Sequence, residues 1–285
     1  MSARPDPMAK TAVVSGPAAR TERPGFQMPG SYRDRNSTSD RTLDILSLFT
    51  DERPRLTASE LAARLGTARS TAYRYLQTLT ASGLVEEDGG GGFRLGMRIF
   101  ALARVARRSY GFSDVVGPVL ADLARATGET ALLTRRHGAS VVCLDKHEAD
   151  GRLLRISYER GSVFAPNAGA SALVLFAWDD PAELAALLET VELPHYTPAT
   201  PATPAEIAAA LQPVRAQGYL VSEGTLDPDA FGVAAPVRDP GGGVTAAVSV
   251  VAVASRVAPG DLDHLISEVL KSAGALSAQL ALVAN

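Results

Sequence analysis

Hydroxyl and guanidinium side chains cluster at the start of one predicted helix in the first third of the chain. The members of this group are Thr67, Arg69, Ser70, Thr71, Tyr73 and Arg74. An arginine can bond guanine O6 and N7 together, and hydroxyl groups can bond phosphates or base edges. Because a helix in the major groove reads bases with its N-terminal residues, the group predicts a contact with DNA.

The elements around this group have the order of a winged helix-turn-helix. A capping box at residues 57–60 predicts a short helix, Ser59 to Leu65, and Gly66 ends it by adopting a positive φ. We expect Thr67 to cap a second helix, Ala68 to Ser82, which presents the polar group.

A glycine-tipped β-hairpin is predicted after the second helix. Its strands are residues 84–87 and 93–95, and Gly89 to Gly92 form the turn. Arg94 on this wing is expected to approach the phosphate backbone of DNA. Two helices and a hairpin occur in many folds, so the pattern alone favours DNA binding without excluding other roles.

These segments resemble the DNA-binding domain of IclR-type bacterial transcription regulators. The similar stretches are Ala58–Gly66, Ser70–Leu79, Gly83–Val85 and Phe93–Gly96. The resemblance continues downstream through Leu123–Thr130, Gly232–Val237 and Ala246–Val250. It spans roughly residues 39–270 and implies a DNA-binding regulator that responds to a small molecule.

The resemblance also implies a GAF-like effector domain that binds a small organic acid or an aromatic metabolite. Carried over by position, its effector site comprises Ala170, Ser171, Ser222, Gly232, Ser249 and Val251. Family members often carry cysteine where Gly232 stands and serine where Val251 stands. We expect these exchanges to enlarge and dry the pocket, which favours a bulkier or more apolar effector than glyoxylate. From the residues alone, the small residues at 168–171 indicate either an anion site at a helix start or simple close packing.

The patterning of the whole chain predicts an α+β protein with two domains joined by a helix. The expected parts are a disordered tail at residues 1–36, a winged helix-turn-helix DNA-binding domain at 37–96, a linker helix at 97–112 and a mixed α/β domain at 113–285. The resemblance implies that this last domain is GAF-like and serves effector binding and oligomerisation. In the last part, helices are predicted near 115–127, 170–177, 181–189, 204–217 and 261–282. Strands are predicted at 131–134, 141–144, 153–158, 219–222, 232–237 and 244–253.

The distribution of charge fits a polyanionic partner. Residues 31–112 hold 13 basic and 9 acidic side chains, whereas residues 113–285 hold 11 basic and 20 acidic ones. We expect the partner to be a palindromic double-stranded DNA operator. A homodimer or a dimer of dimers would bind it, with the linker helix pairing subunits. The chain lacks a run of about 18 apolar residues, so we expect no membrane contact and a cytoplasmic location.

Enzymatic or metal chemistry has weaker support. The four histidines, His137, His147, His195 and His264, stand far apart, and none belongs to a metal motif. Cys143 is the single cysteine, and its apolar surroundings predict a core thiol. We therefore expect no catalytic residue, no cofactor and no metal. The alternative is an enzyme or a small-molecule-binding protein whose N-terminal helices serve as an interaction module. Whether a regulator of this kind represses or activates is left open.

Overall fold

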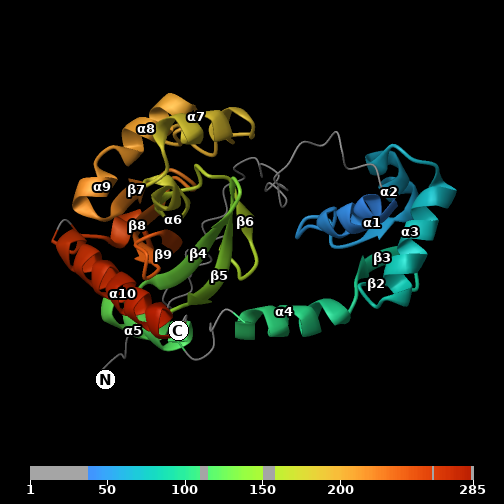
Figure 1. Ribbon diagram of the computed structural model, residues 1–285, viewed down its shortest axis with the longest axis horizontal. Helices are drawn as coiled ribbons and strands as arrows, with labels where there is room; N and C mark the ends of the chain where they lie inside the picture. The colour runs from blue at the N-terminus through green and yellow to red at the C-terminus, as the bar shows by residue number, and fades with distance from the viewer. Residues whose placement is uncertain (1–37, 110–114, 150–157, 259, 284–285) are drawn as a thin grey trace, which may run out of the picture.

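The computed structural model describes residues 38–109, 115–149, 158–258 and 260–283. They form a small N-terminal head and a larger sheet domain, which the helix α4 (Arg98–Ser109) connects (Figure 1). The predicted tail at residues 1–36 and nearly all of the predicted strand at 153–158 lie outside the described residues. No helix within the described ranges combines the length and the apolarity that crossing a membrane requires.

The head consists of three helices and a small sheet around a core of its own. The helices are α1 (Thr38–Ser47), α2 (Ala58–Leu65) and α3 (Arg69–Ala81). The strands β1 (Leu56–Thr57), β2 (Val85–Glu87) and β3 (Gly92–Leu95) pair antiparallel in the order β1-β3-β2. Ile45, Leu61, Leu76 and Phe93 are buried together, so the helices and the wing share one core. The predicted winged helix-turn-helix is confirmed, and β1 is an addition that the sequence did not reveal.

The start of α2 matches the prediction, whereas the start of α3 does not. Thr57 Oγ1 accepts from the Glu60 N–H at 3.2 Å and Glu60 Oε2 accepts from the Thr57 N–H at 2.7 Å, which completes the capping box. The prediction that Thr67 caps α3 is wrong, because Ala68 occupies the cap position. The Thr67 N–H instead donates to Ala62 O at 3.0 Å and helps to close α2.

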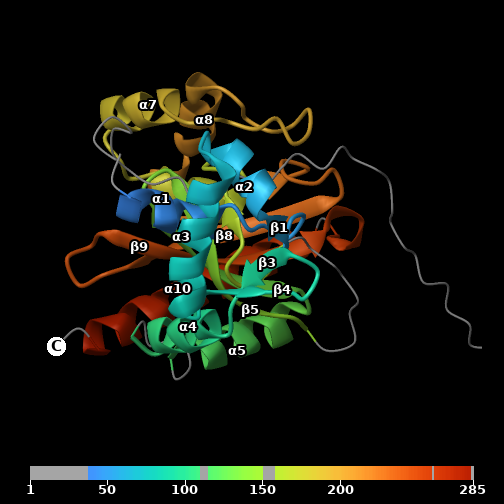
Figure 2. The same ribbon diagram turned by 90° about the vertical axis from the view of Figure 1, so that its right-hand side faces the viewer.

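The larger domain is a six-stranded antiparallel sheet with helices on both faces. Its strands are β4 (Thr130–His137), β5 (Ser140–His147), β6 (Val163–Phe164), β7 (Leu220–Glu223), β8 (Ala230–Arg238) and β9 (Val244–Val253), in the order β6-β5-β4-β9-β8-β7. One face is covered by α5 (Gly117–Thr127) and α10 (Leu262–Val283). The other face carries α6 (Ala170–Leu173), α7 (Pro181–Glu189), α8 (Pro204–Leu211) and α9 (Val214–Gln217) (Figures 1 and 2). The predicted α+β class is confirmed.

Side chains that alternate along the strands fill two apolar cores, one on each face. On β9, Val248 and Val250 enter the core beneath α5 and α10. Ala247 and Val251 point the other way, into the core on the α6 side. Ser249 lies between them in sequence and is fully buried, so the same alternation brings a hydroxyl into the α6 side of the domain.

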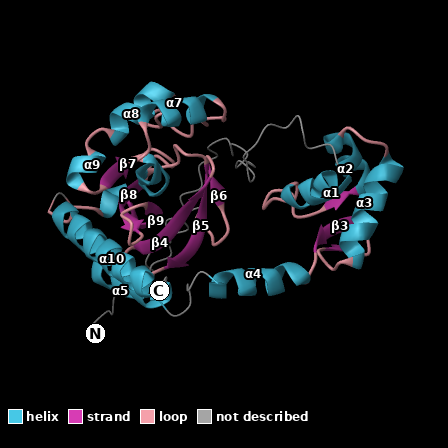
Figure 3. Ribbon diagram, viewed as in Figure 1, coloured by secondary structure: helices cyan, strands magenta, loops and turns pink. Residues whose placement is uncertain are grey.

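On the α6 side, α7 matches the predicted helix at 181–189, whereas two other predicted helices are interrupted. The predicted helix at 170–177 is α6 followed by a single 3-10 turn, Val174–Phe176. The predicted helix at 204–217 is divided at Pro213 into α8 and α9, because proline has no N–H to continue the hydrogen-bond ladder. In Figure 3 a long loop separates α7 from α8 in this region.

Candidate DNA-recognition surface and effector site

The first turns of α3 present the predicted DNA-contact group to solvent. The exposed members on this helix are Arg69, Ser70, Tyr73 and Arg74, and Thr71 is half-buried. The opposite side of the helix is buried in the head core through Ala72, Leu76 and Leu79. Within the described residues, the guanidinium groups of Arg69 and Arg74 have no ion-pair or hydrogen-bond partner. Both are therefore available to an external anion.

Two members of the group are less accessible than the sequence suggested. Thr67 is half-buried, and its hydroxyl is covered and has no hydrogen-bond partner among the described residues. Tyr73 keeps 43 % of its surface exposed, while its ring packs edge-on against Phe93 at 6.2 Å between centroids. The ring contact joins Tyr73 of α3 to Phe93 of the wing strand β3.

Arg94 forms an ion pair within the wing, whereas Asp88 at the wing tip pairs with a residue outside it. Arg94 is exposed, but its Nε donates to Glu86 Oε1 at 2.8 Å across the β2–β3 pair. Asp88 accepts from the Gly90 N–H at 2.9 Å, and this backbone hydrogen bond lowers the pKa of Asp88. Arg55 Nε lies 2.7 Å from Asp88 Oδ2 and adds a cation beside the wing tip. Sequence reasoning missed Arg55 because the two-residue strand that follows it was not predicted.

The helix α4 and the residue before it carry large apolar side chains that are exposed to solvent. Met97, which precedes the helix, and Phe100, Leu102 and Val105 within it are exposed, and Phe100 keeps 70 % of its surface accessible. The sequence predicted that this linker helix pairs subunits, and these exposed apolar side chains lie on it and beside it.

The predicted effector residues lie together where α6 meets the sheet. The register aligns Ser222 of β7, Gly232 of β8 and Val251 of β9 as direct neighbours. The Ala170 N–H donates to Ser222 Oγ at 3.0 Å. The Ser171 and Ser249 hydroxyls are 2.7 Å apart and hydrogen-bonded to each other. Two bonds therefore connect α6 to the sheet through the polar members of the predicted site.

The space beside Gly232 is filled, contrary to the expectation of an enlarged pocket there. A Cβ atom placed on Gly232 would lie 3.2 Å from Ser222 Oγ and 3.6 Å from the Cβ of Ala170. Because Gly232 has no side chain, Ala170 of α6 and Ser222 of β7 can pack closely against it. Val251 is 4 % exposed and belongs to the apolar core on this side, which agrees with the expected loss of polarity.

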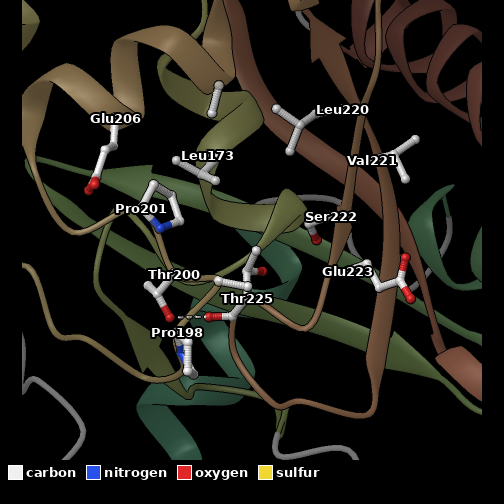
Figure 4. Close-up of a pocket in the computed structure, with 12 residues that line it drawn as sticks. Leu173, Pro198, Thr200, Pro201, Glu206, Leu220, Val221, Ser222, Glu223 and Thr225 are labelled. Atoms are coloured by element: carbon white, nitrogen blue, oxygen red, sulfur yellow. Dashed lines mark hydrogen bonds between the residues drawn. The ribbon is translucent and has the colours of Figure 1, made fainter.

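An open pocket of about 450 Å³ adjoins this cluster and shares Ser222 with it. Leu173 and Leu220 line its apolar wall, and residues 198–201 form the opposite wall (Figure 4). Thr200 Oγ1 donates to Thr225 O at 2.6 Å, which closes one end of the pocket. Sequence reasoning missed this wall, because a Pro- and Thr-rich loop shows no periodicity that would place it.

Asn167 fixes the loop at 194–201, which includes the wall of the pocket opposite Leu173 and Leu220. It is fully buried, and its Nδ2 donates to Pro194 O at 2.9 Å and to Pro201 O at 3.0 Å. Its Oδ1 has no hydrogen-bond partner among the described residues. The loop before α6 and the loop at 194–201 are therefore held together by one amide.

The charged residues that line the pocket are both carboxylates, Glu206 and Glu223. Hydrogen bonds from the Ala202 N–H and Thr203 lower the pKa of Glu206, so it is ionised at neutral pH. A bound anion would have to be stabilised by N–H and hydroxyl groups, since the pocket lining has no cation.

The described residues hold neither a metal-ligating cluster nor a reactive thiol. No group of three or more His, Cys, Asp or Glu side chains in this part of the chain is placed to hold a metal ion. Cys143 is buried, as predicted, and desolvation followed by the nearby Asp145 raises its pKa to about 12. It is a protonated thiol at neutral pH and a poor nucleophile.

Comparison with known protein families assigns both parts of the chain. Residues 108–278 match the family described as the bacterial transcriptional regulator IclR C-terminal domain. Residues 38–89 match the IclR helix-turn-helix domain. The chain belongs to the IclR family. It is a transcription regulator with an N-terminal DNA-binding domain and a C-terminal effector-binding domain, as its resemblance implied.

Relatives and solved structures of the IclR family cover nearly the same span. The HTH-type transcriptional regulator XynR of Escherichia coli is 32% identical over 85% of this chain and 96% of its own length. A putative IclR regulator from Silicibacter sp. TM1040 superposes with a TM-score of 0.77 at 26% identity, covering 86% of this chain and 96% of that one. An IclR homologue from Microbacterium hydrocarbonoxydans, solved with 4-hydroxybenzoate, gives a TM-score of 0.71 at 23% identity, covering 86% and 99% of the two chains.

Proposed function

We propose that this IclR-family regulator reads a palindromic operator with the N-terminal half of α3. Arg69, Ser70, Thr71, Tyr73 and Arg74 would contact bases and phosphates in the major groove, and Thr67 and Arg94 would contact the backbone. The observation that carries the proposal is the pair of exposed guanidinium groups, Arg69 and Arg74, on the face opposite the buried stripe of α3. Unpaired guanidinium groups at the start of a recognition helix suit bidentate contact with guanine.

The roles of the individual residues in this proposal are unequal. Arg94 would have to exchange its bond with Glu86 for a phosphate oxygen, and Thr67 would have to expose its hydroxyl. We therefore assign the largest share of affinity to Arg69 and Arg74. The regulator is proposed to lie in the bacterial cytoplasm, where chromosomal DNA is accessible.

The regulator is proposed to act as a homodimer or a dimer of dimers. Support comes from the exposed apolar side chains around α4, among them Phe100 and Val105, which a second copy of the helix would cover. A two-fold axis through paired α4 helices would present two recognition helices to two half-sites of the operator.

The effector is proposed to be a small organic acid or an aromatic metabolite bound at the α6 end of the sheet. Its contacts would come from Ala170, Ser171, Ser222, Gly232, Ser249 and Val251. Support comes from the convergence of these residues and from the open pocket that reaches Ser222. The complex of an IclR homologue with 4-hydroxybenzoate supports an aromatic acid as the first compound to try.

A mobility-shift experiment tests the proposal. The full-length protein is titrated against DNA from upstream of its own gene and of the adjacent genes, at several salt concentrations. Specific binding should weaken steeply as salt rises, because cationic side chains release counterions from the phosphates. Repeating the titration with 4-hydroxybenzoate, pyruvate and metabolites of neighbouring pathways should identify a compound that changes the affinity. Absence of any specific, salt-sensitive binding would contradict the proposal, and a reporter fusion gives the direction of regulation.

A further inference from the structure

The first turn of α4 is fixed to the head by the backbone. A Cβ atom on Gly96 would lie 2.3 Å from Gly83 O, so the two glycines approach more closely than any other residue type allows. The Gly96 N–H donates to Leu84 O at 2.8 Å, and Arg98 Nη1 donates to Ser82 O at 2.8 Å. The helix therefore leaves the head at a defined angle.

The last turns of α4 are fixed to the sheet domain by one arginine. Arg107 Nη2 lies 3.0 Å from Asp145 Oδ2, and its Nη1 donates to Leu144 O at 3.4 Å. Both acceptors belong to β5, near the edge of the six-stranded sheet. A planar guanidinium that bonds two neighbouring acceptors restrains direction as well as distance.

Asp145 is held in place independently of α4. It is 4 % exposed, and its Oδ1 accepts from the Lys146 N–H at 2.9 Å and forms an ion pair with Arg160 Nε. One carboxylate oxygen thus faces the sheet domain, and the other faces the linker helix. Since a buried carboxylate needs both partners, the position of Arg107 is coupled to that of Arg160.

The segment that carries Arg160 also reaches the effector site. The Gly161 N–H donates to Cys143 O at 2.7 Å, which pins this turn to β5. Two residues before Arg160, the buried Tyr158 donates its hydroxyl to Ala168 O at 3.3 Å, next to the start of α6. Covalent and hydrogen bonds therefore connect the loop before α6 to Asp145 through a few residues. A displacement of that loop can reach Asp145 along this connection.

We propose that Asp145 is a positioning residue for DNA recognition. Together with Arg107 and Arg160 it sets the angle of α4 against the sheet domain. The close contact of Gly96 with Gly83 fixes the orientation of the head relative to α4. In a dimer, the angle determines how far apart the two copies of α3 lie. The inference rests on the proposed binding of a two-half-site operator by a dimer.

Operators with one and two half-sites separate this role from a merely structural one. One head suffices for a single half-site, so its affinity depends on α3 and not on α4. Simultaneous binding of two half-sites gains affinity only when the spacing of the heads matches the DNA. Loss of the Arg107–Asp145 contact should therefore weaken only the two-half-site complex.

The experiment measures Kd by fluorescence anisotropy for the full operator and for a fragment with one half-site. Arg107→Gln should raise Kd for the full operator by about tenfold and leave Kd for the fragment within about twofold of the unaltered protein. Asp145→Asn should give the same pattern, and the double variant should add nothing further, as expected for two residues that act through one contact. The matched control is Arg125→Gln, because Arg125 pairs with Asp122 at 2.6 Å on the exposed side of α5 and should leave both constants unchanged.

Three results would overturn the inference while leaving the proposed function intact. They are unchanged affinity of Arg107→Gln for both DNAs, an equal loss on both DNAs, and additive losses in the double variant. If Asp145→Asn fails to fold, Arg107→Gln decides alone, since Arg107 is only partly buried. Failure of the unaltered protein to bind the full operator would instead contradict the proposed function.

Discussion

Gly96 lies against the carbonyl of Gly83, and a Cβ atom on Gly96 would be 2.3 Å from that oxygen. This contact joins the end of the wing to the turn after α3 and precedes the first turn of α4. We predict that Gly96→Ala lowers the free energy of unfolding of the head by about 1–3 kcal/mol, because the backbone must move apart. Urea unfolding followed by circular dichroism measures the loss.

Gly90→Ala is the control for this substitution. Gly90 has no positive φ, and its added Cβ would meet only Asp88 Oδ1 at an ordinary 3.5 Å. An equal change in stability for both variants would show that the Gly83–Gly96 contact has no special role.

The second prediction concerns the reading edge of α3. Replacing Arg69 and Arg74 by alanine should weaken operator binding by about 1–3 kcal/mol for each arginine that contacts a base. The slope of log affinity against log salt should also become shallower, because fewer phosphates are neutralised. Mobility shifts at several salt concentrations measure both quantities. Unchanged affinity and slope would show that α3 does not read the operator.

The third prediction concerns acid stability at the start of α2. Hydrogen bonds from the Thr57 N–H and hydroxyl lower the pKa of Glu60 below its usual 4.5. A lowered pKa in the folded state means that this contribution to stability is present above pH 4.5 and is lost as the pH falls through the folded value. Thermal unfolding of the unaltered protein and of Glu60→Gln should therefore differ at pH 7 and converge in acid. A difference that persists in acid would contradict the assignment.

The fourth prediction concerns the exposed side of α4. Phe100 is 70 % exposed, and a solvent-exposed aromatic side chain of this size is expected to pack in a dimer. Phe100→Asp should shift the protein toward monomers in analytical ultracentrifugation and weaken binding to two half-sites. Ala103→Asp, at an exposed position of the same helix, adds the same single negative charge and is the control for charge. A dimer that forms equally well in Phe100→Asp would place the subunit contact elsewhere.

The fifth prediction uses the single thiol. Desolvation and the nearby Asp145 raise the pKa of Cys143 to about 12, and the side chain is fully buried. Reaction with a chromogenic disulfide at pH 8 should be slow in the native protein and immediate in denaturant. Fast labelling of the native protein would mean that β5 opens readily.

Local signals in the sequence were sufficient to predict most of the head. The capping box of Thr57 and Glu60 depends only on groups within a few residues, and so does the positive φ of Gly66. The local sequence is therefore enough to predict where α2 begins and ends. Thr67 shows the limit of such signals, because its N–H closes α2 while α3 begins one residue later than predicted, so that Ala68 takes the cap position and the Thr67 hydroxyl caps nothing in the described chain. The strand β1 was missed for a related reason, since Leu56 pairs with Phe93, far along the chain.

The effector site depended on resemblance, because its contacts join distant parts of the chain. The bond between Ser171 and Ser249 and the bond from Ala170 to Ser222 connect residues with no sequence pattern in common. The same applies to the buried Asn167, which holds the loop at 194–201. The residues of the site came from the family, whereas the close packing at Gly232 became visible only in three dimensions.

The head has a separate core, and α4 contacts its two neighbours through few side chains. At the head, Gly96 lies against Gly83 and Arg98 donates to Ser82 O, and at the sheet domain Arg107 bonds Asp145 and Leu144 O. A junction this small can be transplanted as a unit. Chimeric biosensors that join this head to the sensing half of another regulator should respond to the new ligand when both ends of the junction are carried over. Grafts cut inside α4 should instead bind DNA but lose their response.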